Sequence, residues 1–132
     1  LANLGPYANP ELHNMAILRG KFCELLEQLN NQSGPVPSAY LTGLLSLISP
    51  IIHIPIEVIV PKLPIDDTMT TALLNRKGDL GNYLIICEAY EIGDWELIKS
   101  TACTLGLNID DIGMAYHEAL IWQNENMLLG KE

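Results

Sequence analysis

The 132-residue sequence predicts an all-α fold: a compact bundle of about six to seven helices in one domain spanning residues 1–132. Three observations support this prediction. Apolar residues recur at helical spacing in most segments, and short junctions of Gly, Asp, Asn or Pro separate those segments. A hydrophobic content of 48% is ample for a buried core at this length.

The first helix is expected to start at Asn9-Pro10-Glu11. Asn is a good cap, Pro suits the first helical position, and an acidic residue suits the first turn. One apolar stripe, expected to face the core, runs along this helix with spacings of three and four: Met15, Leu18, Phe22, Leu25 and Leu29. The polar run Asn30 to Pro37 should then form a turn.

The most apolar stretch, Ser38 to Lys62, is expected to lie at the centre of the bundle. A buried helix should begin near Ser38 and end or kink near Pro50, and a short second piece should follow over 56–60. The segment 54–60 is β-branched enough to form a strand, but no other segment would pair with it. A helix or an extended connector is therefore favoured there.

A membrane span is not expected in this stretch, although its apolar run has the length of about 20 residues that a span needs. Prolines and ionisable residues interrupt the run: Pro50, Pro55, Pro61, His53 and Glu57. Within the same run, Gly43 either lets a neighbouring helix approach closely or is a tolerated small residue in a core helix.

Four further helices are predicted over 66–78, 79–93, 94–106 and 108–127. Each begins with a residue that caps helices well, namely Asp66, Asp79, Asp94 and Asn108. A glycine at the end of each of the first three suits a left-handed C-terminal cap.

The formal net charge of −9, from seven Lys and Arg against sixteen Asp and Glu, argues against nucleic acid or an anionic membrane surface as a partner. The close basic pairs are Arg19 with Lys21 and Arg76 with Lys77. Both pairs are expected to be solvated, at helix ends or on polar faces.

Three cysteines, Cys23, Cys87 and Cys103, are an odd number with no CxxC spacing. They are expected to be reduced core thiols of a cytoplasmic protein. The start of the sequence has no signal-peptide pattern. Because the sequence opens on Leu1 rather than Met, it is expected to be a piece of a larger protein.

No catalytic, cofactor or metal site is predicted. The three histidines, His13, His53 and His117, are not followed by Asp, and the HExxH pattern that begins at His117 has Ile121 at the second His position. The acidic pairs 66–67 and 110–111 are explained by helix capping. Neither a phosphate-binding P-loop nor a nucleophile elbow occurs.

Three aromatic residues are candidates for partner contact: Tyr40, Trp95 and Trp122. The two tryptophans could equally close the core. If part of the protein is absent, an apolar face of the first helix or of segment 40–52 is expected to be uncovered and to favour self-association.

Four phrases, in order, resemble one family. The segment RGKFCELL (19–26) is similar to an "RAxFCELL" helix, and YLTGLLSL (40–47) is similar to an "FLxGLLSL" helix. LPI (63–65) with ALL (72–74) and AYEIGDW (89–95) are similar to the family's "LPL…ALL" and "AYExGDW" phrases. The chain thus resembles the C-terminal half of HDOD domains, in particular those that follow an EAL domain in bacterial cyclic di-GMP signalling proteins. The resemblance covers about residues 15–122.

The resemblance implies an all-helical relative of the HD phosphohydrolases that has lost the metal-binding His and Asp residues and acts in regulation. Its expected partners are the upstream EAL/HDOD region of the same protein or another signalling protein, and a homo-oligomer is possible. Gly20 stands where the family has Ala, at a cost of about 1 kcal/mol of helix propensity, which casts doubt on the rigidity of that helix.

Two rival readings remain open. One is a divergent metal-dependent phosphohydrolase that uses His53 or His117 with nearby carboxylates. The other is a repeat-type adaptor, which would need further helix pairs outside the present sequence.

Overall fold

The computed structural model describes residues 9–31 and 37–130, and this part of the chain is helical with no β-strand. Seven of its α-helices have five residues or more, so the predicted all-α class is confirmed. The elements in order are α1 (Pro10–Asn31), α2 (Pro37–Leu45), α3 (Ile48–Ile52), α4 (Ile56–Ile59), the 3-10 turn η2 (Val60–Lys62), α5 (Asp67–Asn75), α6 (Gly78–Ile92), α7 (Trp95–Leu105) and α8 (Ile109–Gly130).

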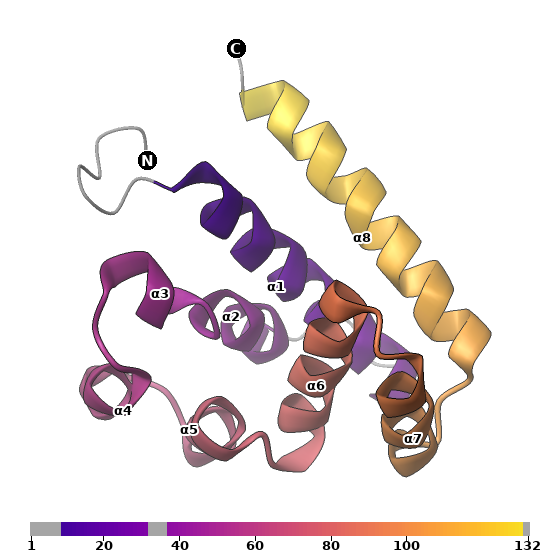
Figure 1. Ribbon diagram of the computed structural model, residues 1–132, viewed down its shortest axis with the longest axis horizontal. Coiled ribbons are helices and arrows are strands. Elements are labelled where there is room, and N and C mark those ends of the chain that lie inside the picture. The colour runs from indigo at the N-terminus through magenta and orange to yellow at the C-terminus, as the bar shows by residue number, and fades with distance from the viewer. Residues whose placement is uncertain (1–8, 32–36, 131–132) are drawn as a thin grey trace.

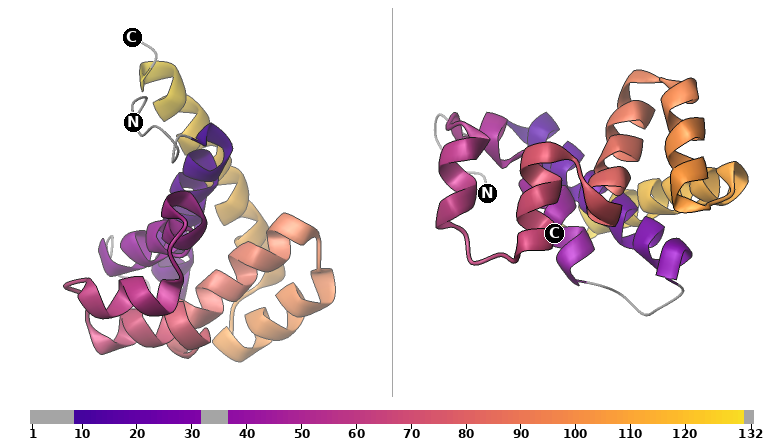
Figure 2. Two further views of the ribbon diagram at one scale, coloured as in Figure 1. Left: turned by 60° about the vertical axis from the view of Figure 1, so that its left-hand side comes forward. Right: turned by 90° about the horizontal axis from the view of Figure 1, so that it is seen from below.

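Helix α1 is the central element, because it packs against α2, α6 and α8. Helix α8 runs beside α1 in the opposite direction, so the first and last helices lie together (Figure 1). Helices α6 and α7 form an antiparallel pair next to the start of α8 (Figure 2). The short helices α3 and α4 continue from α2 on the far side of the bundle (Figure 1).

The core is built mainly from α1, α6 and α8. Its large, fully buried side chains include Phe22, Leu26, Tyr83, Leu84, Ile86 and Ile112. A smaller cluster of Ala16, Leu47 and Ile51 joins α1 to α3. The predicted stripe of α1 faces these two clusters, as its 3.6-residue period requires.

Side-chain caps begin four of the helices, and all four are residues that the sequence predicted as caps. Asp66 accepts a hydrogen bond from the Met69 amide at 2.9 Å, and Asp94 accepts one from the Leu97 amide at 3.2 Å. Asn9 caps α1 through the Leu12 amide. The fourth, Asn108, was also predicted as a cap, and its side chain accepts from the Asp110 amide at 2.7 Å. These bonds satisfy amides that the first helical turn leaves unpaired.

The central helix was predicted to end or kink near Pro50, but the break lies earlier, at residues 46–47 between α2 and α3. The Ser46 hydroxyl donates to the Gly43 carbonyl at 2.7 Å, which competes with continued helical bonding. Pro50 lies in the first turn of α3, where its missing N–H has no intrahelical partner to lose. Segment 56–62 is helical, so the strand alternative is excluded.

The predicted junction at Gly78 and Asp79 is also wrong in detail. Helix α5 ends at Asn75, Arg76 takes the left-handed conformation (φ 54°), and α6 already begins at Gly78. Arg76 tolerates this conformation because its guanidinium donates to the carbonyls of Ala72 and Leu73, which lie in the last turn of α5. No side-chain cap precedes α6, and Asp79 lies in its first turn.

Gly20 and Gly43 mark a close crossing of α1 and α2. A Cβ atom on Gly43 would lie 2.6 Å from the backbone atoms of Arg19 and Gly20, and one on Gly20 would lie 2.9 Å from the Tyr40 carbonyl oxygen. Of the two interpretations of Gly43, close approach is therefore correct. Gly20 lowers the helix propensity of α1, but the absence of a side chain there allows α2 to approach this closely.

The cysteines do not share one environment. Cys23 on α1 and Cys87 on α6 are buried, with their sulfur atoms 3.6 Å apart, whereas Cys103 on α7 is exposed. The prediction that all three are core thiols is wrong for Cys103, because it lies on the solvent side of the amphipathic helix α7. In the described part of the chain, no helix combines the length and apolar character needed to cross a bilayer.

Candidate interaction surface

An aromatic cluster joins the helices beneath the exposed face of α8. Phe22, which is buried, contacts Tyr90 edge-on at a ring-centroid distance of 5.3 Å and Tyr116 at 5.2 Å. Tyr90 and Tyr116 lie 4.7 Å apart. Burial, and then the neighbouring Tyr116, raise the pKa of Tyr90, so this ring stays neutral. The cluster thus joins α1, α6 and α8 to one another.

Trp95 extends this cluster to the surface. Helix α6 ends at Gly93, whose φ of 70° allows the amide of Asp94 to reach the Ala89 carbonyl at 2.9 Å. This turn places Trp95 at the start of α7, where its ring meets Tyr90 edge-on at 5.5 Å. Trp95 is 58% exposed, the exposure that its predicted role in partner contact requires.

A partly buried ion network fixes the end of α6 against α1. Arg19 is only 7% exposed and donates to both carboxylate oxygens of Glu91, each at 2.7 Å. The same guanidinium donates to the Ser46 hydroxyl at 2.9 Å. On the preceding turn of α6, Glu88 accepts two hydrogen bonds from Arg76, at 3.0 and 2.9 Å.

The prediction of a solvated Arg19 is therefore wrong. Burial lowers the pKa of Arg19, but the hydrogen bonds and charge of Glu91, followed by Glu88, outweigh it and leave the pKa raised. Burial likewise raises the pKa of Glu88, yet Arg76 and then Arg19 leave it lowered overall. Both groups therefore stay charged at neutral pH, and the paired charges hold the turn that presents Trp95.

An open groove with a volume of about 740 Å³ lies beside Tyr90 along the outer face of α8. We call it the α8 groove, and its lining residues are Tyr90, Ile109, Asp110, Gly113, Met114, His117, Glu118 and Ile121. Apolar side chains are unusually accessible here. Met114 is 70% exposed and Ile121 is 48% exposed.

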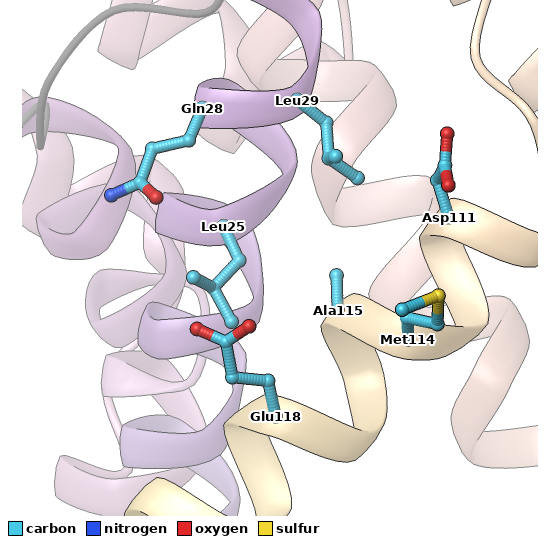
Figure 3. Close-up of a pocket in the computed structure, with 7 residues that line it drawn as sticks. All are labelled: Leu25, Gln28, Leu29, Asp111, Met114, Ala115 and Glu118. Carbon is cyan, nitrogen blue, oxygen red and sulfur yellow. The ribbon is translucent and has the colours of Figure 1, made fainter.

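A smaller hollow of about 250 Å³ lies on the other side of Met114, at the crossing of α1 and α8 (Figure 3). Leu25, Gln28 and Leu29 line it from α1, while α8 contributes Asp111 and Ala115. Met114 and Glu118 line both this hollow and the α8 groove, so they form the ridge between them. The exposed surface of α8 thus carries apolar side chains, Met114 and Ile121, next to the acidic Asp110, Asp111 and Glu118.

Trp122 and Tyr40 contact each other, whereas Trp95 contacts Tyr90. The rings of Trp122 and Tyr40 meet edge-on at 6.2 Å, and the Lys21 ammonium lies 5.0 Å from the centre of the Trp122 ring. Both aromatic side chains are half-buried, and Trp122 ties α8 to α1 and α2. The three predicted contact residues are therefore not brought together in one site, and partner contact by each of them stays a prediction.

Exposed apolar side chains also occur beyond the α8 groove, on α2 and around α4. Leu41, Ile54 and Val58 are each at least 40% exposed. The predicted apolar face of α1, in contrast, is covered, because Phe22, Leu25 and Leu26 lie in the core. Self-association through segment 40–52 stays a prediction.

The histidines lie in three different places. His13 bonds to the Asn9 carbonyl near the start of α1, His53 follows α3 in a left-handed conformation, and His117 lines the α8 groove. Among the described residues, no three His, Cys, Asp or Glu side chains form a group that could hold a metal ion. The acids Asp66 and Asp110 lie at helix starts.

Comparison with known proteins gives two relatives. Cyclic di-GMP phosphodiesterase CdgJ of Vibrio cholerae serotype O1 is 30% identical over 115 residues, which are 87% of this chain and 27% of CdgJ. The chain is similar to one segment of that phosphodiesterase. The uncharacterized protein YuxH of Bacillus subtilis (strain 168) is 34% identical over 125 residues, 92% of the chain and 29% of YuxH. The chain spans less than a third of either relative.

No protein-family model matches the chain, and no solved structure matches it. The similarity to CdgJ agrees with the resemblance to cyclic di-GMP signalling proteins that the four sequence phrases carry. It covers most of the chain, and therefore most of the described helices.

Sequence reasoning missed two features of this surface. The Arg19–Glu91 pair joins two helices 72 positions apart, and periodicity within one helix does not report such a contact. The α8 groove was missed because its apolar members, Ile109, Met114 and Ile121, look like core positions of an amphipathic helix. The clue available in the sequence was that α8 has apolar residues on more than one face.

Proposed function

We propose that this chain is a non-catalytic regulatory module of a bacterial cyclic di-GMP signalling protein and that it works through contacts with another domain or protein. The observation that carries the proposal is the similarity over 87% of the chain to a segment that makes up 27% of a cyclic di-GMP phosphodiesterase. The four sequence phrases that resemble HDOD domains support the finer assignment, the C-terminal half of such a domain after an EAL domain.

The partner in this proposal is either the upstream EAL/HDOD region of the same protein or another signalling protein. A module of this kind needs surface side chains that lose water on contact. Trp95, Met114 and Ile121 are large, exposed and close to the aromatic cluster that ties three helices together. A rigid helical support under exposed apolar groups keeps the entropic cost of association low.

The test is light scattering on a size-exclusion column. The chain is run alone and then mixed with the separately expressed region that precedes it in its gene. A complex of one to one stoichiometry is expected. A chain that stays monomeric and ignores the upstream region, at concentrations well above 10 μM, contradicts the proposal.

The alternative is a divergent metal-dependent phosphohydrolase of the HD superfamily. His117 shares the α8 groove with Asp110 and Glu118, residue types that bind Mn²⁺ or Mg²⁺, but among the described residues no three such side chains are close enough together to hold a metal ion, so the alternative requires a rearrangement of this face. Its test is incubation with cyclic di-GMP and with bis(p-nitrophenyl) phosphate in the presence of Mn²⁺ or Mg²⁺. Metal-dependent turnover that is abolished by His117→Ala, or by His53→Ala, would replace the regulatory proposal with the enzymatic one.

A further inference from the structure

The α8 groove has the length of a short helix. Its lining residues on α8 run from Ile109 to Ile121, twelve steps of 1.5 Å, or about 18 Å. Residues 110, 113 and 114, 117 and 121 follow one another at spacings of three and four, so the groove follows a single face of α8. A partner helix of three to four turns lying along α8 would cover it from end to end.

The lining of the groove combines apolar and acidic side chains. Met114 and Ile121 offer aliphatic surface, while Asp110 and Glu118 flank them. No Lys or Arg occurs between residues 109 and 130, whereas four acids do: Asp110, Asp111, Glu118 and Glu125. This distribution favours an occupant whose apolar stripe is bordered by positive charge.

A second copy of the chain fits this description poorly, because among its described residues only two exposed lysines, Lys62 and Lys77, lie outside an ion pair. The chain has seven Lys and Arg against sixteen Asp and Glu, and its arginines Arg19 and Arg76 are engaged in ion pairs. Lys21 lies against Trp122 and Glu24, and Lys99 lies near Glu96. Two copies meeting through α8 would bring acidic side chains together, which opposes contact.

We propose that the α8 groove docks an amphipathic protein helix that has aliphatic residues at spacings i, i+3 or i+4 and i+7 and has Lys or Arg on either side of that stripe. This inference rests on the proposed function and names the chemistry of its partner. The aliphatic stripe covers Met114 and Ile121, and the basic residues face Asp110 and Glu118.

The experiment is selection of helical peptides from a randomised display library against the whole chain. Peptides with a basic-flanked aliphatic stripe are expected to be enriched. Met114→Lys and Ile121→Lys should each weaken peptide binding about tenfold or more. Each substitution removes an apolar contact and adds a positive charge that repels the basic residues of the peptide. Asp110→Asn should reduce the dependence of binding on salt.

The matched control is Leu74→Lys. Leu74 lies on α5, outside the groove, and its exposure of 40% is close to the 48% of Ile121. Binding by this variant should stay within about twofold of wild type. Circular dichroism checks that all of the variants keep their helices.

Three results would overturn the inference: no enrichment, enrichment of acidic or uncharged peptides, or selected peptides that bind Met114→Lys and Ile121→Lys as well as wild type. Failure of the proposed function looks different. If Met114→Lys still forms the light-scattering complex with the upstream region, the regulatory role stands and the groove is not its contact. If wild type forms no such complex, the regulatory role fails whatever the peptides do.

Discussion

Arg19 and Glu91 form a bidentate ion pair in which both hydrogen bonds are 2.7 Å long. The pair joins the middle of α1 to the last turn of α6, directly before the bend that exposes Trp95. Arg19 is almost completely buried, and the Glu91 side chain is 26% exposed. The pair therefore stabilises one relative placement of the two helices, and its removal should have consequences for both stability and surface shape.

Replacing Arg19 with Met should lower the free energy of unfolding by about 2–4 kcal/mol, because Glu91 is left without its partner in a partly buried position. The double variant Arg19→Met with Glu91→Leu should lose less than Arg19→Met alone, since it leaves no unpaired charge. Urea unfolding followed by circular dichroism measures both. The control Lys99→Met removes an exposed pair and should change stability by less than about 0.5 kcal/mol. A loss as large for Lys99 as for Arg19 would contradict the role assigned to burial.

Stability should fall in acid partly through Glu88. The pKa of Glu88 in the folded protein lies below its ordinary value of 4.5, so the unfolded chain binds a proton more readily than the folded one. Its contribution is present above pH 4.5 and disappears as the pH falls through the lowered folded pKa. Melting temperatures of wild type and Glu88→Gln, measured between pH 7 and pH 3, should therefore converge at the acid end. A constant gap across that range would show that Glu88 ionisation is not involved.

Alanine should have opposite effects at two helical glycines. Gly43→Ala should destabilise the protein by about 2 kcal/mol or more, because its Cβ would lie 2.6 Å from the backbone of α1. Gly113→Ala should stabilise it by about 0.5–1 kcal/mol, because the Tyr90 hydroxyl lies 3.6 Å from the new Cβ, an ordinary contact distance, and helix propensity then dominates. Equal effects at the two sites, measured by thermal unfolding, would argue against a close crossing of α1 and α2.

One thiol of three should react in the native protein. Cys103 is exposed, whereas Cys23 and Cys87 are buried, and burial, together with the hydrogen bond to Cys23, raises the pKa of Cys87 well above its ordinary value. Labelling with an aromatic disulfide reagent should modify one cysteine in buffer and three in denaturant. Cys103→Ser should abolish the native signal. Rapid native labelling of that variant would mean that the core around α1 and α6 opens readily.

Local signals in the sequence predicted most of the fold. Asn9, Asp66, Asp94 and Asn108 cap helices as expected, and Gly93 and Gly106 end α6 and α7 with positive φ. These features depend on residues within one turn of each other, so a linear reading can find them. The prediction of a helical rather than a strand segment at 56–60 was also correct.

The errors arose where a distant residue decides the local structure. Arg76 takes a glycine-like conformation because its side chain reaches back to the carbonyls of α5 and across to Glu88. Ser46, near the break between α2 and α3, is also bonded to Arg19 on another helix. The candidate surface was predicted only in part: Trp95 is exposed, but the α8 groove beside it depends on how α6 and α8 come together.

The pairing of α1 with α8 also determines when the protein can finish folding during synthesis. Phe22 on α1 needs Tyr116 on α8, and the two are separated by most of the described chain. A ribosome adding about 5–20 residues per second needs about 4–16 s to go from the end of α1 to the start of α8. During that interval the apolar face of α1 has no α8 to cover it. The nascent chain is then most exposed to chaperones and proteases, and a pause in translation before residue 109 would prolong that exposure.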